Sequence, residues 1–168
     1  MRPRAVPRLP ADWSLSLPAL PSLRLGSCDH AGNPQVCRAL AAEELPDGRL
    51  LVLVAERAAP RVVAALRQTA RVALLATSPR NNRTLHMKGH DACVSPALPH
   101  HAALLALRRD TLARELAEVD GFAGAPFLDH WYDVPVHALT AVTFSVAGAW
   151  NQTPGPNAGQ AVALETDA

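Results

Sequence analysis

The chain of 168 residues has few cysteines, few aromatic residues and no long apolar run. No stretch approaches the ~20 apolar residues that a membrane-spanning helix needs. The sixteen basic and fifteen acidic residues nearly cancel and are scattered, which gives no sign of a nucleic-acid partner. The sequence also lacks internal repeats, a P-loop, a dinucleotide glycine fingerprint and a Gly-x-Ser-x-Gly elbow. Its length and its hydrophobic fraction of 49% predict one folded domain with a buried core.

The three cysteines, Cys28, Cys37 and Cys93, are odd in number and form no CxxC pair. This pattern favours buried thiols in a reducing compartment. Prolines interrupt the N-terminal arginines before any apolar stretch, so we expect no signal peptide and a cytoplasmic protein. His86, His90 and Cys93 are close in sequence, but their spacing matches no structural zinc site. We therefore expect no bound metal.

Six apolar or alternating segments predict β-strands joined by short turns. They cover residues 22–28, 35–42, 50–54, 71–77, 83–94 and 139–146. Aspartate, glycine, asparagine and proline between residues 29 and 34 supply the backbone geometry of a hairpin turn. The uninterrupted apolar run 50–54 is typical of a strand buried on both faces.

Two helices are predicted among these strands. The first covers residues 61–68, and Pro60 stands at the helix start, where a proline costs little. The second covers residues 99–119, is expected to end at Asp120-Gly121, and has a predicted core face of Leu105, Leu112, Leu116 and Val119. Its predicted solvent face consists of Arg108, Arg109, Arg114, Glu115 and Glu118.

Short connections favour antiparallel pairing, and the absence of repeated βαβ units argues against a doubly wound sheet. We therefore predict a mainly β fold of the α+β class, a six-stranded antiparallel split β-barrel with helices over its ends. The expected organisation is a proline-rich N-terminal arm over residues 1–21, one domain over 22–155 and a C-terminal tail over 156–168.

The order of these elements, with the segments QVCRAL, RTLHMKG and AWNQTPGPNAG, resembles the pyridoxamine 5'-phosphate oxidase-like FMN-binding split barrels. The resemblance covers roughly residues 23–159. It implies a homodimer with FMN in a groove at the subunit interface, and hence an FMN-dependent oxidoreductase acting on an unknown small molecule. Glu43 stands where the oxidases carry a lysine, and their arginine-rich C-terminal motif is missing, which argues against vitamin B6 oxidation. A non-catalytic flavin- or haem-binding protein of the same fold is the alternative.

The resemblance also assigns a phosphate site. Arg38, on the second predicted strand, matches the arginine that reaches the FMN phosphate, and Arg61 matches a basic residue of the short helix. Arg57 lies near the same helix start, where free N–H groups favour an anion. Guanidinium groups suit this role because they bind phosphate oxygens in a bidentate way. Without the resemblance, Arg38 reads as an outward-facing strand residue and Arg57 as a solvated loop charge.

The remaining candidates lie around the cofactor, and among them Thr84 and Lys88 are expected to assist the two arginines at the phosphate, Lys88 alternatively donating to a flavin carbonyl. Thr84, His86 and Lys88 alternate along one strand and therefore share one of its faces, either a polar groove or the solvated exterior of the barrel. Thr84 matches the position of a glutamine near the flavin in oxidase members. The last candidates for contact with the cofactor, on two further strands and in the C-terminal segment, are Ala39, Val54, Trp150 and Gln152.

Overall fold

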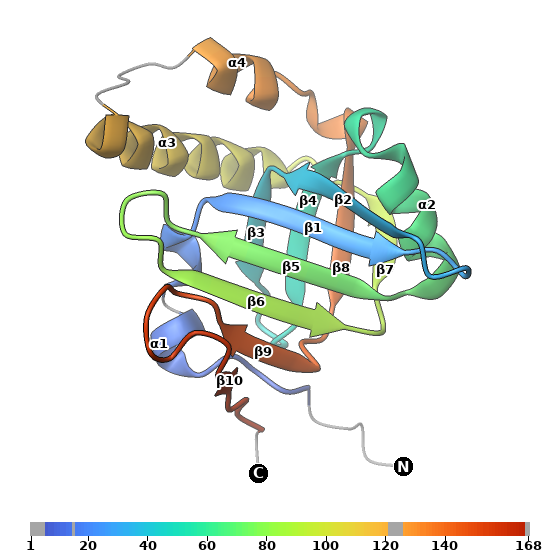
Figure 1. Cartoon of the computed structure of the whole chain (residues 1–168). Helices are drawn as coiled ribbons and strands as arrows, with labels where there is room; N and C mark the ends of the chain where they lie inside the picture. Colours follow the sequence, from blue (N-terminus) through green and yellow to red (C-terminus); the bar gives the residue numbers. More distant parts are fainter. Residues whose placement is uncertain (1–5, 15, 121–125, 167–168) are drawn as a thin grey trace.

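The structure, a computed structural model, describes residues 6–14, 16–120 and 126–166. Within these ranges the strands form two antiparallel sheets, and Figure 1 shows the larger sheet in front of the smaller one. The larger sheet has the order β10 (Ala161–Val162), β9 (Gly148–Asn151), β6 (Thr84–Gly89), β5 (Val72–Thr77), β1 (Ser22–Cys28) and β2 (Pro34–Ala39). The smaller sheet has the order β3 (Ala41–Glu44), β4 (Leu50–Ala55), β8 (Leu139–Phe144) and β7 (Cys93–Pro96). The α+β class is confirmed, but the strands form a six-stranded and a four-stranded sheet instead of the single six-stranded set that was expected.

Two of the predicted strands are wrong as single elements, because each one bends and supplies both sheets. The predicted strand 35–42 splits at Leu40 into β2 and β3, and the predicted strand 83–94 splits into β6 and β7. Strands that bend at the corner between two sheets are a general way of joining them. Gly89 makes the second corner possible, since a Cβ there would lie 2.6 Å from the carbonyl oxygen of Ser145. Periodicity does not report such bends, because both halves keep their alternation.

The core has two parts, one on each side of the four-stranded sheet. The first lies between the two sheets and includes Leu25, Leu74 and Val52. The second lies between the four-stranded sheet and the helices α3 (His101–Asp120) and α4 (Pro126–Tyr132), and it includes Leu51. The alternating residues of β4 therefore enter both parts, and the prediction that this strand is buried on both faces is confirmed. The short helix α2 (Pro60–Thr69) follows the predicted bounds closely and packs against β1 and β2.

The proline-rich segment contains the helix α1 (Ala11–Ser14) and the 3-10 turn η1 (Leu17–Ala19). Its apolar side chains belong to the first part of the core, the one between the two sheets: Leu9, Trp13, Leu17 and Leu20. Arg8 forms a β-bridge with Glu165, and β10 pairs with β9, so both ends of the described chain contact the same sheet. Two further 3-10 turns, η2 (Glu56–Ala58) and η3 (Val136–Ala138), connect the other elements.

The predicted faces of the long helix need a correction. Arg108 and Glu115, placed on the solvent face, are buried, whereas Val119, placed on the core face, is 48% exposed. Both buried groups make hydrogen bonds: the terminal nitrogens of the Arg108 guanidinium donate to backbone carbonyls, although its Nε has no partner, and the Glu115 carboxylate accepts from the Ser78 hydroxyl. Helical periodicity identified the helix, but not the polar contacts that orient it. Gly121, expected to end the helix, lies outside the described residues.

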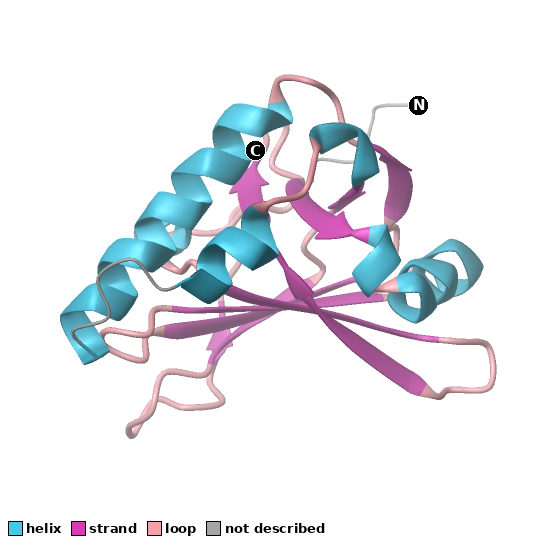
Figure 2. Cartoon of the chain, turned by 90° about the horizontal axis from the view of Figure 1, so that it is seen from above, coloured by secondary structure: helices cyan, strands magenta, loops and turns pink. Residues whose placement is uncertain are grey.

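Figure 2 shows the helices on one side of the strands, so the outer face of the six-stranded sheet has no helical cover in the part of the chain that the structure describes. In Figure 1 this face is the one turned toward the viewer. None of the helices in the described ranges combines the length and apolar character that crossing a bilayer requires. We call the outer face of the six-stranded sheet the open face.

Candidate functional site

Strand pairing brings one row of side chains together across the open face. Arg38 of β2 pairs with Arg24 of β1, which pairs with Leu75 of β5. Leu75 pairs with His86 of β6, and His86 pairs with Trp150 of β9. Side chains at directly paired positions point to the same face of a sheet. Two arginines, a histidine and a tryptophan therefore lie in one line across this face, and only the Arg38 end of the line contacts a helix, at Trp131 of α4.

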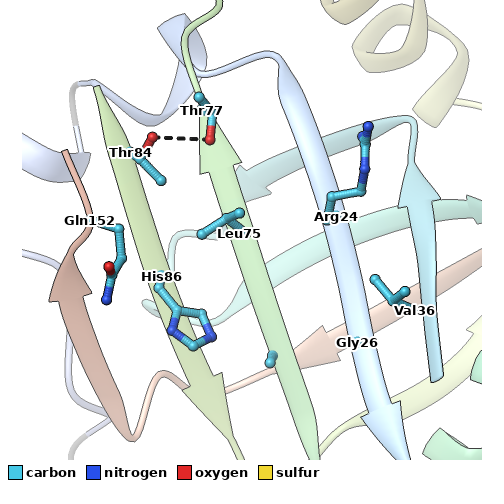
Figure 3. A pocket seen from close by; sticks show the side chains of 9 residues that line it. Arg24, Gly26, Val36, Leu75, Thr77, Thr84, His86 and Gln152 are labelled. Carbon is cyan, nitrogen blue, oxygen red and sulfur yellow. Dashed lines mark hydrogen bonds between the residues drawn. The ribbon is translucent and has the colours of Figure 1, made fainter. Parts of the chain in front are cut away.

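A hollow of about 610 Å³ lies along this row. Figure 3 shows Arg24 and His86 on opposite sides of Leu75, with Thr77 and Thr84 at one end of the hollow. Gly26 and Ala73 form its floor at the other end. An added Cβ on Gly26 would meet only ordinary contacts, the nearest being the Gln35 carbonyl oxygen at 3.5 Å. Because glycine and alanine carry little or no side chain, this part of the floor is formed mainly by backbone and leaves room for a ligand.

Arg24 lines one side of the hollow, and Arg38, its partner on the neighbouring strand, lies beyond it. Arg24 is exposed and donates to the carbonyl of its neighbour Leu23 at 3.0 Å. The Arg38 guanidinium stacks on the Trp131 ring of α4 at 3.6 Å from the ring centre. Burial, and secondarily the charge of Arg24, lower the pKa of Arg38. Among the described residues no carboxylate pairs with either guanidinium, so two like charges face each other across adjacent strands.

On the other side, the hollow is lined by His86, which belongs to a cluster of an imidazole, an indole and an ammonium group. The rings of His86 and Trp150 have centres 5.9 Å apart, and the Lys88 Nζ lies 5.2 Å from the Trp150 ring centre. The indole lies over Gly148, where an added Cβ would be 2.7 Å from the ring. Burial, and secondarily the charge of Lys88, lower the pKa of His86. The imidazole is therefore neutral at pH 7 and can donate or accept a hydrogen bond.

Hydroxyl groups close the threonine end of the hollow. The Thr84 hydroxyl lies 3.1 Å from that of Thr77, and Figure 3 marks this hydrogen bond. The backbone N–H of Thr84 donates to the Thr153 hydroxyl at 3.0 Å, and that of Gln152 donates to the Thr84 carbonyl at 2.9 Å. These bonds hold the segment after β9 against β6, so that the exposed Gln152 side chain lines the hollow.

The ten residues predicted from the sequence divide into two groups. Six of them lie on the open face or at its edge: Arg38, Thr84, His86, Lys88, Trp150 and Gln152. The other four lie elsewhere. Ala39 and Val54 are buried in the first part of the core, and Arg57 is exposed in η2.

Arg61 is the fourth, and within one chain it does not converge with Arg38. It is exposed on α2 and lines a different hollow, of about 360 Å³, together with Gln35. Alternation along β2 puts Gln35 and Arg38 on opposite faces of the strand. The side chain facing Arg38 across the hairpin is Arg24 instead.

Sequence reasoning missed Arg24 and Thr77, although a signal for both was present. The hairpin turn pairs Cys28 with Pro34, and counting back along both strands brings Arg24 opposite Arg38. In the same way, the turn at Asn82 pairs Thr77 with Thr84. The register of a hairpin is fixed by its turn, so both partners follow from the turn positions.

The cysteines and histidines do not form a second site. Cys93 is exposed and Cys28 and Cys37 are only partly buried, which corrects the expectation that the thiols are buried. Burial raises the pKa of the Cys37 thiol to about 11, so this thiol stays protonated and is a poor nucleophile at neutral pH. Across residues 6–14, 16–120 and 126–166, no three histidine, cysteine or acidic side chains are grouped as a metal site would require.

Comparison by sequence finds no matching family model and no matching curated protein. Comparison of structures finds the same fold in HupZ of Group A Streptococcus, with a TM-score of 0.54, 10% identity and coverage of 90% of this chain and 100% of that one. A candidate pyridoxamine 5'-phosphate oxidase from Lactobacillus delbrueckii matches with a TM-score of 0.51, 15% identity and coverage of 84% and 93%. The resemblance in fold to pyridoxamine 5'-phosphate oxidase-like proteins is thereby confirmed.

Proposed function

Since the chain shares the fold of a candidate pyridoxamine 5'-phosphate oxidase, we propose that its open face binds FMN and that the protein is a flavin-dependent oxidoreductase. The observation that carries this proposal is the Arg24–Arg38 pair, which has no carboxylate partner in the described part of the chain. Like charges on paired strand positions destabilise a sheet, and a bound anion removes that repulsion. A phosphate monoester, with its negative charge and three acceptor oxygens, fits two guanidinium groups.

The rest of the hollow suits the flavin ring. Gly26 and Ala73 offer a floor formed mainly by backbone, and Leu75 offers an apolar surface beside it. The neutral imidazole of His86 can hydrogen-bond to a ring nitrogen or carbonyl. The Gln152 side chain adds a donor and an acceptor at the threonine end of the hollow. FMN would supply hydride and electron transfer when bound, while these residues would bind and orient it.

We also infer that a second copy of the chain covers the open face and forms a homodimer. Val36 lines the hollow and is 71% exposed, the highest value among the large apolar residues that the structure describes. Together with Leu75 and Ala73 it forms an apolar part of the open face that a partner would cover, and such cover would exclude water from a bound cofactor.

The proposal is tested by titrating FMN against the purified protein and following the quenching of flavin fluorescence. Arg24→Ala and Arg38→Ala should each weaken binding about 10- to 150-fold, because a charge-assisted hydrogen bond contributes about 1.5–3 kcal/mol. Arg57→Ala is the matched control and should change the affinity less than twofold. Sedimentation with and without FMN measures dimer formation. Equal FMN affinity in the wild type and both open-face variants would exclude this phosphate site.

His86 favours a second candidate, a haem-binding protein of the same fold. Its imidazole has no hydrogen-bond partner among the described residues, faces the hollow and has a lowered pKa, and neutral imidazole is a common metal ligand. The two arginines would then pair with the propionates. A Soret band that disappears in His86→Ala supports this candidate, whereas a flavin spectrum retained in His86→Ala supports the first one.

A further inference from the structure

The open face continues past the first hollow into a second one. This second hollow has a volume of about 360 Å³ and lies toward the opposite ends of β1, β5 and β6. Both hollows are lined by Gly26 and Ala73, so the same floor runs through them. The two hollows are therefore parts of one elongated groove rather than separate sites.

Three basic side chains line the second hollow. They are Arg71, which precedes β5, Lys88 of β6, and His90, which follows β6. Ala73 pairs with Lys88, and continuing the same register brings Arg71 opposite His90. Lys88 therefore lies on the open face, and Arg71 and His90 flank it just beyond the ends of β5 and β6, lining the same hollow. Lys88 is the only lysine in the chain.

These three basic side chains have no acidic partner among the described residues. No aspartate or glutamate is among the described residues that line the second hollow. Neither Arg71 nor His90 has a side-chain hydrogen bond or ion pair within the described residues, and the Lys88 ammonium contacts only the Trp150 ring. A cluster of bases beside this floor, with no carboxylate among its lining residues, is suited to an anion.

The second cluster is distinct from the Arg24–Arg38 pair. Arg24 pairs with Leu75, and Arg71 lies four residues before Leu75 on the same side of the sheet. At about 3.3 Å per residue, Arg71 is about 13 Å from the Arg24 row along the strand, and Lys88, which pairs with Ala73, lies between them at about 7 Å from that row. A single phosphate group does not bridge Arg24 and Arg71, so the groove has a separate group of basic side chains at each end.

We propose that Arg71, Lys88 and His90 form a second oxyanion site, which binds the carboxylate or phosphate of the small-molecule substrate. The substrate's reacting part would lie on the Gly26–Ala73 floor, beside the flavin ring, while the flavin phosphate occupies the Arg24–Arg38 pole. The anion site itself stands on the contacts above, and only its role as a substrate site rests on the proposed flavin function.

The single lysine gives a direct probe of this site. Reductive methylation with ¹³C-formaldehyde keeps the positive charge and yields two NMR signals, one from Lys88 and one from the N-terminal amine. Inorganic phosphate or acetate is then titrated at constant ionic strength, with and without saturating FMN. We expect a saturable shift of the Lys88 signal in both conditions, and no saturable shift of the N-terminal signal, which serves as an internal control. Whichever of phosphate and acetate binds more tightly shows whether the site prefers a phosphate or a carboxylate.

Two variants sharpen the measurement. Arg71→Gln should raise the apparent Kd for the tighter probe at least fivefold, whereas Arg114→Gln, on the exposed side of α3, should change it less than twofold. A linear, non-saturating shift of the Lys88 signal would overturn the second site. Loss of the saturable shift on adding FMN would also overturn it, because the two poles would then be one site. A saturable shift in a protein that does not bind FMN would retain the anion site and reject the flavin function instead.

Discussion

The two sheets use arginine in opposite ways. On the helix-covered side, Arg108 of α3 is 2% exposed, and its guanidinium donates to the carbonyls of Leu17, Pro18 and Ala42. On the open face, Arg24 and Arg38 lie side by side, and no described carboxylate pairs with them. The Arg108 guanidinium has a structural role, because its hydrogen bonds join the N-terminal segment, β3 and α3. The other two remain available to a ligand, which is why the functional proposals concern the open face.

Removing the buried guanidinium should have the largest effect. Arg108→Met keeps an apolar stem of similar length but leaves buried carbonyl groups without a donor. An unsatisfied buried polar group costs about 1–3 kcal/mol, so we expect a loss of about 3 kcal/mol in the free energy of unfolding, measured by urea denaturation. Arg114→Met, on the exposed side of the same helix, should change it by no more than about 0.5 kcal/mol. Similar losses in the two variants would show that Arg108 contributes only its apolar stem.

A smaller, pH-dependent effect is expected at the start of α3. The His101 Nδ1 accepts from the backbone N–H of Leu98 at 3.0 Å, and the ring is 6% exposed. Burial and the neighbouring His100 lower the pKa of His101, while Glu43 opposes them. The folded state therefore favours the neutral ring. Its stabilising effect is complete above about pH 6.5, the value for an unfolded histidine, and is lost as the pH falls through the lowered pKa.

Urea denaturation at pH 7.5 and 5.5 measures this effect. The loss attributable to His101 should not exceed about 1.4 kcal/mol per pH unit, the slope for one proton. His101→Asn retains a hydrogen-bond acceptor and should reduce the pH dependence, whereas His30→Asn, on an exposed turn, should not. An unchanged pH dependence in His101→Asn would assign the acid sensitivity to other groups.

The smallest effect is expected on the open face. Arg24→Gln removes one of two like charges at paired strand positions, so it should stabilise the ligand-free protein by about 0.2–0.5 kcal/mol. The gain should shrink as ionic strength rises, because salt screens exposed charges. A destabilisation of similar size to that of Arg108→Met would show that Arg24 is part of the structural framework and would remove the contrast between the two sheets.

Much of the fold followed from local patterns. The hairpin of β1 and β2, the strands β5 and β8 and the helix α2 lie where turn residues and periodicity predicted them. The division of 35–42 and 83–94 between two sheets did not follow, because a bend changes the partner of a strand without changing its alternation. The strands β9 and β10 were also missed, since they are short and lie among turn residues.

The site was predictable to a similar extent. Thr84, His86 and Lys88 share a face by alternation alone, and the hairpin register brings Arg24 opposite Arg38. The separation of Arg61 from Arg38 was not predictable, because it depends on which face of β2 the helix α2 covers. The burial of Arg108 was not predictable either, since its partners are backbone carbonyls distant in sequence.

The sequence by itself determined the strand and helix segments, their turns and the register of adjacent hairpins, because these depend on residues only a few positions apart. The tertiary structure alone decided which polar side chains are buried and hydrogen-bonded in the core and which remain on the open face. That distinction depends on long-range packing: α3 and α4 bury one side of the four-stranded sheet, and no described helix covers the outer side of the other sheet. The same residue type, arginine, is structural in the first environment and available to an anion in the second.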